Sequence, residues 1–441
     1  MVNRNLTGSL VSRFLSDYGM LGVLLVLGGL FGVLTIREQH PTGADAGRQV
    51  ANVIAERQGE NARVLIVARD TSEDRLFSDA AAKQLEAIGA TVLARVNGSP
   101  GDVRAAIEKI VADGDQINAI VANDVTAKWS VYDRFPSLGS AARVTPTPYF
   151  WPDFLKLSNL LGVANQTAIY AMIAIGMTMV IVSAGIDLSV GSLVALASVV
   201  AALVIRDGGG GAGAGVGMVV VGCLAGIAVC GAAGAFNGLM ITVFQIPPFI
   251  VTLGMMMIAS GLAFRLSDGR SISELPPSFL WLGGAQTLSV PNPVWLMLAL
   301  YLVAHVIMSR MVFGRYVYAI GGNEEAARLS GVPVKRMLLT IYTICGALAG
   351  LGGIVLTSQL AAGDPKFGLM YELEVIAAVV VGGASLMGGR GKVFGTLIGA
   401  FIIAVIKNGM NLTNVDPFNQ RIVLGAVLLM AVLLDTLRRR R

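Results

Sequence analysis

Apolar segments of about 20 residues, the length that an α-helix needs to cross a bilayer, recur along this chain and constrain its fold more than any other feature. The composition agrees, because 54% of the 441 residues are hydrophobic, 14% are charged and the mean hydropathy is +0.70. Soluble domains carry about 25% charged residues. The sequence therefore predicts an all-α polytopic membrane protein with about ten transmembrane helices.

The predicted organisation has three parts. A tail and first transmembrane helix occupy 1–36, a polar segment occupies 37–150, and the remaining membrane domain occupies 151–441. The predicted spans of the last part are 164–184, 188–205, 214–237, 248–266, 293–312, 337–358, 373–386, 393–411 and 420–437.

The segment 37–150 differs in kind from the rest. Short buried-type strands are expected at 63–68, 91–96 and 118–122, and helical patterns at 79–88 and 102–112 separate them. Strands that alternate with helices at this spacing predict a βαβαβ unit with a parallel sheet. We expect this inserted α/β domain on the extracytoplasmic side.

Positive charge gathers in alternate loops. On the cytoplasmic side of the predicted topology it includes Arg4, Arg13, Arg310, Arg315, Arg328, Lys335, Arg336, Arg390, Lys392 and the run 438–441. The other side has few, namely Arg206, Arg270 and Lys366. This bias predicts a multi-pass protein of the cytoplasmic membrane with both termini inside.

The basic loop 314–336 contains one short polar helix, expected at 324–331 and closed by Gly331. Such a helix can present a handle to a cytoplasmic partner, and the alternative is a solvated loop that only obeys the charge bias.

The stretch VSAGIDLSVGS (182–192) places Asp187 between two apolar spans. An acid at membrane depth either lines a cavity or is paired, which makes it a functional candidate. The alternative is a turn, in which Asp187 and Ser189 cap the next helix after Gly185 breaks the previous one.

Four motifs occur in order: VSAGIDLSVGS, QIPPFIVTLGMMMIASG (245–261), GRYVYAIGGNEEAARLSGV (314–332) and YELEVIAAVVVGGASLMGGRGKVFGTLIGA (371–400). Together they resemble the permease subunits of bacterial ribose-type ABC importers, over about residues 150–437. The resemblance implies import of a monosaccharide or similar small polyol. It also implies a second permease copy, in a homodimer or heterodimer, a pair of cytoplasmic ATPases and an extracytoplasmic sugar-binding protein.

In this resemblance the polar helix is the contact with the ATPase, formed by Asn323, Glu324, Glu325, Arg328 and Gly331. Two departures stand out. Glu374 replaces the aspartate common in the family, and 37–150 replaces a short connection. Through GSPGDVRAAIEKIVADGDQINAIVAN (98–123) the insert resembles one lobe of a sugar-binding protein. The alternative is a lobe that only docks or spaces.

The chain carries no catalytic signature of its own. It has no GxxxxGK[ST], HExxH or GxSxG motif, and its cysteines and histidines form no ligand cluster. We therefore expect a transport subunit rather than an enzyme, without cofactor or metal, and with membrane lipid but no nucleic acid as a partner.

Polar residues inside the apolar segments are candidates for the translocation path, although such residues also bridge helices without any ligand. They are Ser183, Asp187, Ser189, Asn237, Thr252, Gln359, Glu374, Asn408 and Asn411.

Two rival classes remain. An ion-coupled secondary transporter would need several membrane acids, for which only Asp187, Glu372 and Glu374 qualify. A membrane-anchored ligand sensor would need a cytoplasmic output domain, yet the chain stops soon after the last span.

Overall fold

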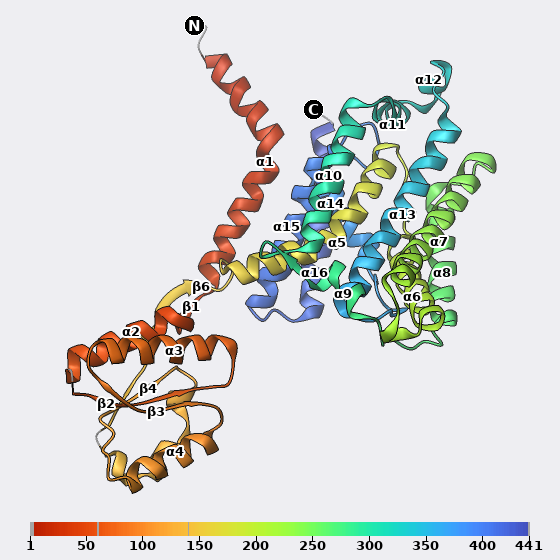
Figure 1. Ribbon diagram of the computed structural model, residues 1–441. Helices are drawn as coiled ribbons and strands as arrows, with labels where there is room; N and C mark the ends of the chain where they lie inside the picture. The colour runs from red at the N-terminus through yellow and green to blue at the C-terminus, as the bar shows by residue number, and fades with distance from the viewer. Residues whose placement is uncertain (1–3, 60, 140, 440–441) are drawn as a thin grey trace. The chain divides into compact units, whose positions relative to one another are not determined.

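The computed structural model describes the backbone of residues 4–59, 61–139 and 141–439. The side chains of 1–18 and 438–441, with the predicted charges Arg4, Arg13 and the run 438–441, lie outside the described residues. The chain forms two compact units, one of Met1–Thr35 with Asp153–Arg441 and one of Ile36–Pro152 (Figure 1). Each unit is described by itself.

The helical unit is built from apolar helices of very different length. Seven helices of the described chain are long and apolar enough to cross a membrane. They are α5 (Leu157–Val182), α6 (Val190–Gly209), α7 (Val216–Val243), α8 (Pro248–Leu266), α10 (Asn292–Arg310), α13 (Val334–Leu360) and α15 (Val393–Leu412).

The predicted count of ten crossings is not confirmed. In the described part of helices α1 (Arg4–Leu34) and α16 (Pro417–Arg439), the apolar stretches are the shorter Gly19–Leu34 and Pro417–Leu433. The predicted span 373–386 is instead α14 (Tyr371–Val381), whose 11 residues extend only about 17 Å. Gly382 and Gly383, the latter at φ +91°, end α14. A half-length helix therefore stands where a full crossing was expected.

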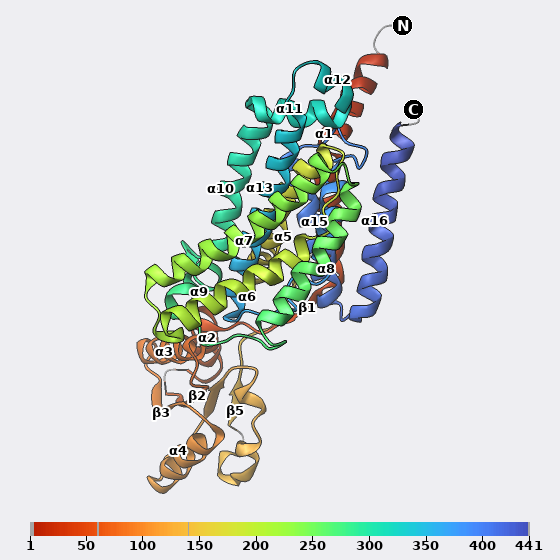
Figure 2. The ribbon, with the colours of Figure 1, turned by 90° about the vertical axis from the view of Figure 1, so that its right-hand side faces the viewer.

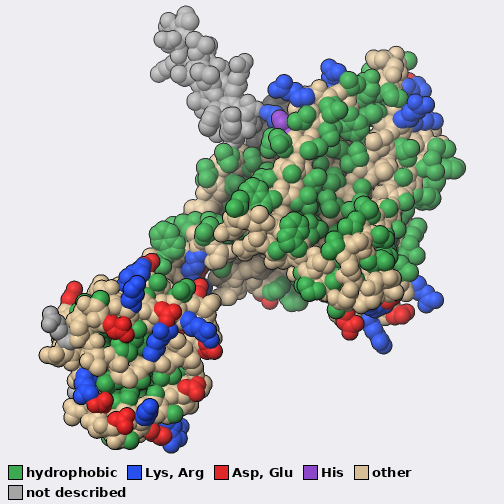
Figure 3. Space-filling view, in the orientation of Figure 1, with side chains coloured by type: hydrophobic (Ala, Val, Ile, Leu, Met, Phe, Trp, Pro, Cys, Tyr) green, Lys and Arg blue, Asp and Glu red, His purple; other side chains and the backbone are tan. Residues whose placement is uncertain are grey.

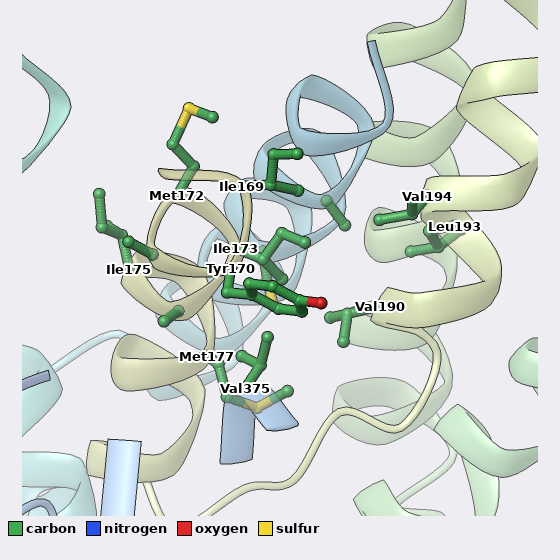
Figure 4. Close-up of a cluster of buried hydrophobic side chains, with 14 of the residues drawn as sticks. Ile169, Tyr170, Met172, Ile173, Ile175, Met177, Val190, Leu193, Val194 and Val375 are labelled. Carbon is green, nitrogen blue, oxygen red and sulfur yellow. The ribbon is translucent and has the colours of Figure 1, made fainter. Parts of the chain in front are cut away.

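The core of this unit surrounds α5. This helix packs against α10, α13, α14 and α15, and in Figure 4 the ring of its Tyr170 points toward Val190 of α6. Helix α5 is buried along most of its length, whereas only a minority of the residues of α7 and α8 are buried. The surface drawn in Figure 3 is accordingly largely apolar over the helical unit. Because the backbone N–H and C=O groups of a helix bond to one another within the helix, its apolar surface can face lipid.

Glycines allow the closest helix contacts. A Cβ at Gly346 would collide with the Cys230 carbonyl of α7, and one at Gly234 would collide with the Tyr342 carbonyl of α13. Close backbone approach of this kind replaces the hydrophobic effect as the source of helix association in lipid.

Short elements connect the spans. Helix α9 (Pro277–Gly284) and the hairpin β7 (Gln286–Thr287) and β8 (Val290–Pro291) precede α10. Helices α11 (Val312–Gly322) and α12 (Glu324–Leu329) join α10 to α13, and both lie at one end of the helical unit (Figures 1 and 2). The first part of the predicted loop is thus helical, because Val317 and Ile320 bury one face of α11.

The unit Ile36–Pro152 contains the predicted parallel sheet. Its four strands lie in the order β3 (Thr91–Asn97), β2 (Arg63–Ala68), β4 (Ala119–Ala122), β5 (Ala142–Val144), all parallel. Helices α2 (Gly43–Gln58) and α3 (Ser72–Ala87) pack on one core, and α4 (Pro100–Ala112) belongs to a second core. The predicted βαβαβ unit is confirmed, with α2 and β5 in addition.

An antiparallel ribbon closes this unit. Strand β1 (Ile36–Gln39) pairs with β6 (Tyr149–Pro152), from Ile36 opposite Pro152 to Gln39 opposite Tyr149. The segment that enters the unit and the segment that leaves it are therefore held side by side. With buried cores on both sides of the sheet, the unit has what an independently folding domain needs.

Candidate coupling and translocation sites

The chain between α5 and α6 is a buried helix break. Helix α5 ends at Val182, Ala184 takes the left-handed conformation at φ +65°, and α6 begins at Val190. The carboxylate of Asp187 is completely buried, and its Oδ1 accepts bonds from the Ser189 backbone N–H (2.9 Å) and the Ser189 hydroxyl (2.5 Å). Asp187 therefore orders the turn, whereas Ser189, the N-cap residue of α6, makes no side-chain cap bond of the predicted kind.

Neighbouring helices hold this break through polar contacts. Asn237 of α7 donates its Nδ2–H to the Ser189 hydroxyl (3.2 Å). The Thr252 hydroxyl of α8 donates to the Pro248 carbonyl of its own helix (2.9 Å) and lies 3.3 Å from the Ile186 carbonyl. The thiol of Cys345 lies next to the Asp187 carboxylate. The structure thus brings together four of the predicted residues, Asp187, Ser189, Asn237 and Thr252, all of them completely buried.

The other predicted path residues lie elsewhere. Ser183 donates to the Val180 carbonyl at the end of α5, and Gln359 is half-buried near the end of α13. Asn408 exchanges hydrogen bonds with Asn159 of α5 (2.9 and 3.0 Å), and Asn411 accepts a bond from Gln420 of α16 (2.8 Å). Asn408 and Asn411 therefore bridge helices, as the alternative for small polar residues predicted.

Glu374 belongs to a part-buried ion pair that was not predicted from the sequence. Lys407 of α15 contacts both carboxylate oxygens of Glu374 at 2.9 Å, and its Nζ lies 3.2 Å from the Tyr170 hydroxyl. The side chains of Lys407 and Glu374 are 18% and 17% exposed. The signal was present, since a lysine in an apolar segment is as unusual as Asp187.

Helix α12 lies where the sequence predicted a short polar helix, but it ends at Leu329 rather than at 331. The Asn323 side chain accepts the Ala326 N–H (2.9 Å) as an N-cap, Glu325 pairs with Arg328 (2.5 Å), and Gly331 takes φ +85° just after the helix. Ala327 is buried beneath it, whereas Leu329 is 80% exposed. The exposed surface of the helix therefore carries charged groups and one large apolar side chain.

The loop after α14 ties this end of the unit to the helix break. Gly389 donates its N–H to the Val182 carbonyl (2.8 Å), and Tyr318 of α11 donates its hydroxyl to the Gly391 carbonyl (2.7 Å). A Cβ at Gly321 would collide with that same Val182 carbonyl. Helix α11, loop 383–391 and the last residue of α5 are thus packed into one structure.

This helical unit is a transport permease. Residues 159–432 match the family described as "Branched-chain amino acid transport system / permease component", and the chain belongs to that family. The match begins after the Ile36–Pro152 unit ends.

Among its relatives, the ribose import permease protein RbsC of Escherichia coli (strain K12) is 41% identical over 288 residues, which are 64% of this chain and 87% of the relative. RbsC of Bacillus subtilis (strain 168) is 42% identical, over 68% of this chain and 91% of the relative. The L-arabinose transport system permease protein AraH of E. coli (strain K12) is 38% identical, over 65% and 85%. No solved structure matches the chain.

Proposed function

We propose that this chain is the permease subunit of an ATP-driven ABC importer, and that it carries a monosaccharide or similar small polyol across the cytoplasmic membrane. The observation that carries the proposal is the identity of about 40% with ribose and arabinose permeases over most of their length. The four motifs that the sequence analysis identified all lie within the matched part.

The energy comes from partner ATPases that contact α12 on the cytoplasmic side. Support for this contact is the exposed charge of Glu324, Glu325 and Arg328 beside the exposed Leu329. Protein interfaces combine an apolar centre, here Leu329, with a polar rim, here the charged side chains around it. The chain works with a second permease copy and with an extracytoplasmic sugar-binding protein.

A movement of α12 can reach the break between α5 and α6 through a few direct contacts. Helix α12 follows α11 after one residue, Tyr318 of α11 holds loop 383–391, and Gly389 of that loop holds Val182. Five residues after Val182 comes Asp187. Because packed glycine contacts are not compressible, a shift of α11 moves this break with it.

We further propose that the Ile36–Pro152 unit lies outside the cytoplasm and has a docking or shielding role rather than a sugar-binding one. The polar residues at the carboxyl edge of its sheet are mostly used within the unit. Asp70 pairs with Arg75, Asn123 accepts the Val125 and Thr126 N–H groups, and Asp124 pairs with Lys128. The buried Oδ1 of Asn97 at the same edge, by contrast, has no hydrogen-bond partner among the described residues. With most of its acceptors occupied, the edge still favours docking over sugar binding.

Uptake of labelled sugars tests the proposal. The chain is expressed with its partner ATPase and binding protein in cells that lack their own pentose importers. We expect ATP-dependent accumulation of at least one pentose or hexose that a protonophore does not abolish while ATP is maintained. Uptake that follows the proton or sodium gradient and ignores loss of the ATPase would instead show the ion-coupled transporter.

A further inference from the structure

A second site lies away from the Asp187 cluster, in a cavity of about 490 Å³ between α6, α8 and the segment that follows α13. Met256 and Met257, which line it, lie at the middle of α8. Both α6 and α8 are long and apolar enough to cross the membrane, so this cavity lies inside the membrane thickness.

One wall of the cavity is non-helical backbone. Between the end of α13 at Leu360 and the start of α14 at Tyr371, the chain runs along α6. Asp364 donates its N–H to the Ser198 hydroxyl (3.1 Å), and Gly368 packs directly on the Gly191 carbonyl. Irregular backbone at membrane depth is tolerated only where protein buries it or where it lines a water-filled cavity.

The cavity also contains an acid that forms no ion pair among the described residues, although the exposed Lys366 borders the same space. Glu372 is half-buried, and its carboxylate packs against Gly191, where a Cβ would collide with it. Within the described chain no Lys or Arg pairs with Glu372, in contrast to Glu374, which Lys407 neutralises. An unpaired carboxylate at this depth requires water or a polar ligand.

The remaining lining suits a sugar. The hydroxyls of Ser192 and Ser260 and the rings of Phe264 and Phe367 border the same space. Sites for small molecules combine mostly apolar and aromatic walls with a few placed polar groups, and their volumes are about 300–1,000 Å³. A carboxylate accepts hydrogen bonds from sugar hydroxyls, and serine can both donate and accept.

We propose that this cavity is the water-accessible part of the translocation path in which the sugar rests, with Glu372 accepting bonds from its hydroxyls. The substrate class rests on the proposed function, whereas the access of water does not. The path is thereby placed at α6, α8 and 361–372 rather than at the closed cluster around Asp187.

Thiol labelling of the full-length protein in membrane vesicles tests the cavity. Cys223→Ala removes the one native cysteine that is not buried, and Ser260→Cys or Ile258→Cys is then added. Ile258 is the matched control, since it lies at the same depth of α8, is 53% exposed and does not line the cavity. Thiols react as thiolates, so we expect a charged, membrane-impermeant reagent to label Ser260→Cys at least about tenfold faster than Ile258→Cys.

The role of Glu372 is tested in the assembled importer. Glu372→Gln should raise the KM for sugar import at least about tenfold, because hydrogen bonds to a charged acceptor are the stronger ones. The transported sugar should slow the labelling of Ser260→Cys. Equal labelling of the two cysteine variants would overturn the cavity as a water path. Normal import by Glu372→Gln, or labelling that sugar leaves unchanged, would overturn the substrate assignment. If the wild-type importer moves no sugar, the proposed function fails while the labelling result still stands.

Discussion

At the scale of single residues, the helical unit uses its few polar side chains to hold irregular backbone. Asp187 accepts both Ser189 donors inside the break between α5 and α6, and Thr252 reaches the Ile186 carbonyl from α8. The second oxygen of Asp187, Oδ2, has no hydrogen-bond partner among the described residues. The acceptor at Oδ1, rather than the negative charge, is therefore what the turn needs.

This predicts a difference between two substitutions of Asp187. Asp187→Asn keeps an acceptor at Oδ1 and should retain most transport. Asp187→Leu leaves the buried Ser189 donors without an acceptor, which costs about 1–3 kcal/mol for such a group. We expect this variant to lose most transport and to unfold at lower temperature in detergent. Equal activity of wild type, Asn and Leu would show that the residue does not order the break.

The ion pair of Glu374 and Lys407 predicts a strongly non-additive pair of mutations. Lys407→Met should destabilise the protein by about 3–5 kcal/mol, because a buried carboxylate then has no cation. Glu374→Gln combined with Lys407→Met removes both charges and should restore most of the stability. Denaturation of the single and double variants measures the coupling, and additive losses would contradict it.

At the scale of elements, interrupted helices distinguish this fold from a simple bundle. Helix α14 ends after 11 residues, and its following loop packs against α11 and the end of α5. Helix α12 stands at the same end of the unit, where it carries an N-cap, a short ion pair and a closing glycine. These features keep a six-residue helix ordered although it is mostly exposed.

The prediction for α12 concerns coupling. Glu324→Ala combined with Arg328→Ala removes exposed charge from the proposed ATPase contact without touching the Asn323 cap. We expect the importer to assemble and hydrolyse ATP while sugar uptake falls at least about tenfold, because charged contacts to the ATPase are lost. The Glu325–Arg328 pair within α12 is lost as well, so circular dichroism of the variant checks that the protein stays folded. ATPase activity and uptake are measured on the same vesicles.

Arg270→Ala with Glu274→Ala is the matched control. Both residues are exposed and lie just before α9. Ile272, between them, bonds to Gly363 after the C-terminal end of α13, whereas α12 precedes the N-terminal end of α13. We expect these charges to be dispensable for coupling. Normal uptake by the α12 variant would remove this helix from the mechanism.

At the scale of the whole molecule, two units with different solvents share one chain. The helical unit exposes apolar surface, whereas Ile36–Pro152 carries interspersed charges over its surface (Figure 3). The β1–β6 ribbon joins the two ends of the inserted unit to each other. The insert can therefore be cut out at its ribbon without opening either core.

The isolated fragment 36–152 should fold as a monomer and bind no monosaccharide with micromolar affinity. A single lobe leaves a ligand exposed on one face, and its edge acceptors are mostly occupied. Circular dichroism checks the fold, and calorimetry with ribose, arabinose, xylose and galactose checks binding. Micromolar binding of any of these sugars would make the unit a receptor instead of a docking domain.

The sequence by itself determined the membrane class, the parallel sheet, a short polar helix at α12 with its closing glycine, and the break at Asp187. Each of these depends on local composition, period or turn chemistry, which neighbouring residues in the chain specify. Four long motifs were also sufficient for the family, because they lie within one continuous stretch.

Only the tertiary structure decided what the polar residues at membrane depth do. It joined Glu374 to Lys407, 33 positions away, bridged Asn408 to Asn159, and left Glu372 unpaired in a cavity. It also shortened α14, whose apolar sequence continues beyond the glycines that end it. Hydropathy reports only that a residue is costly in lipid, whereas its partner is set by which helices pack together, and this packing joins segments far apart in the chain.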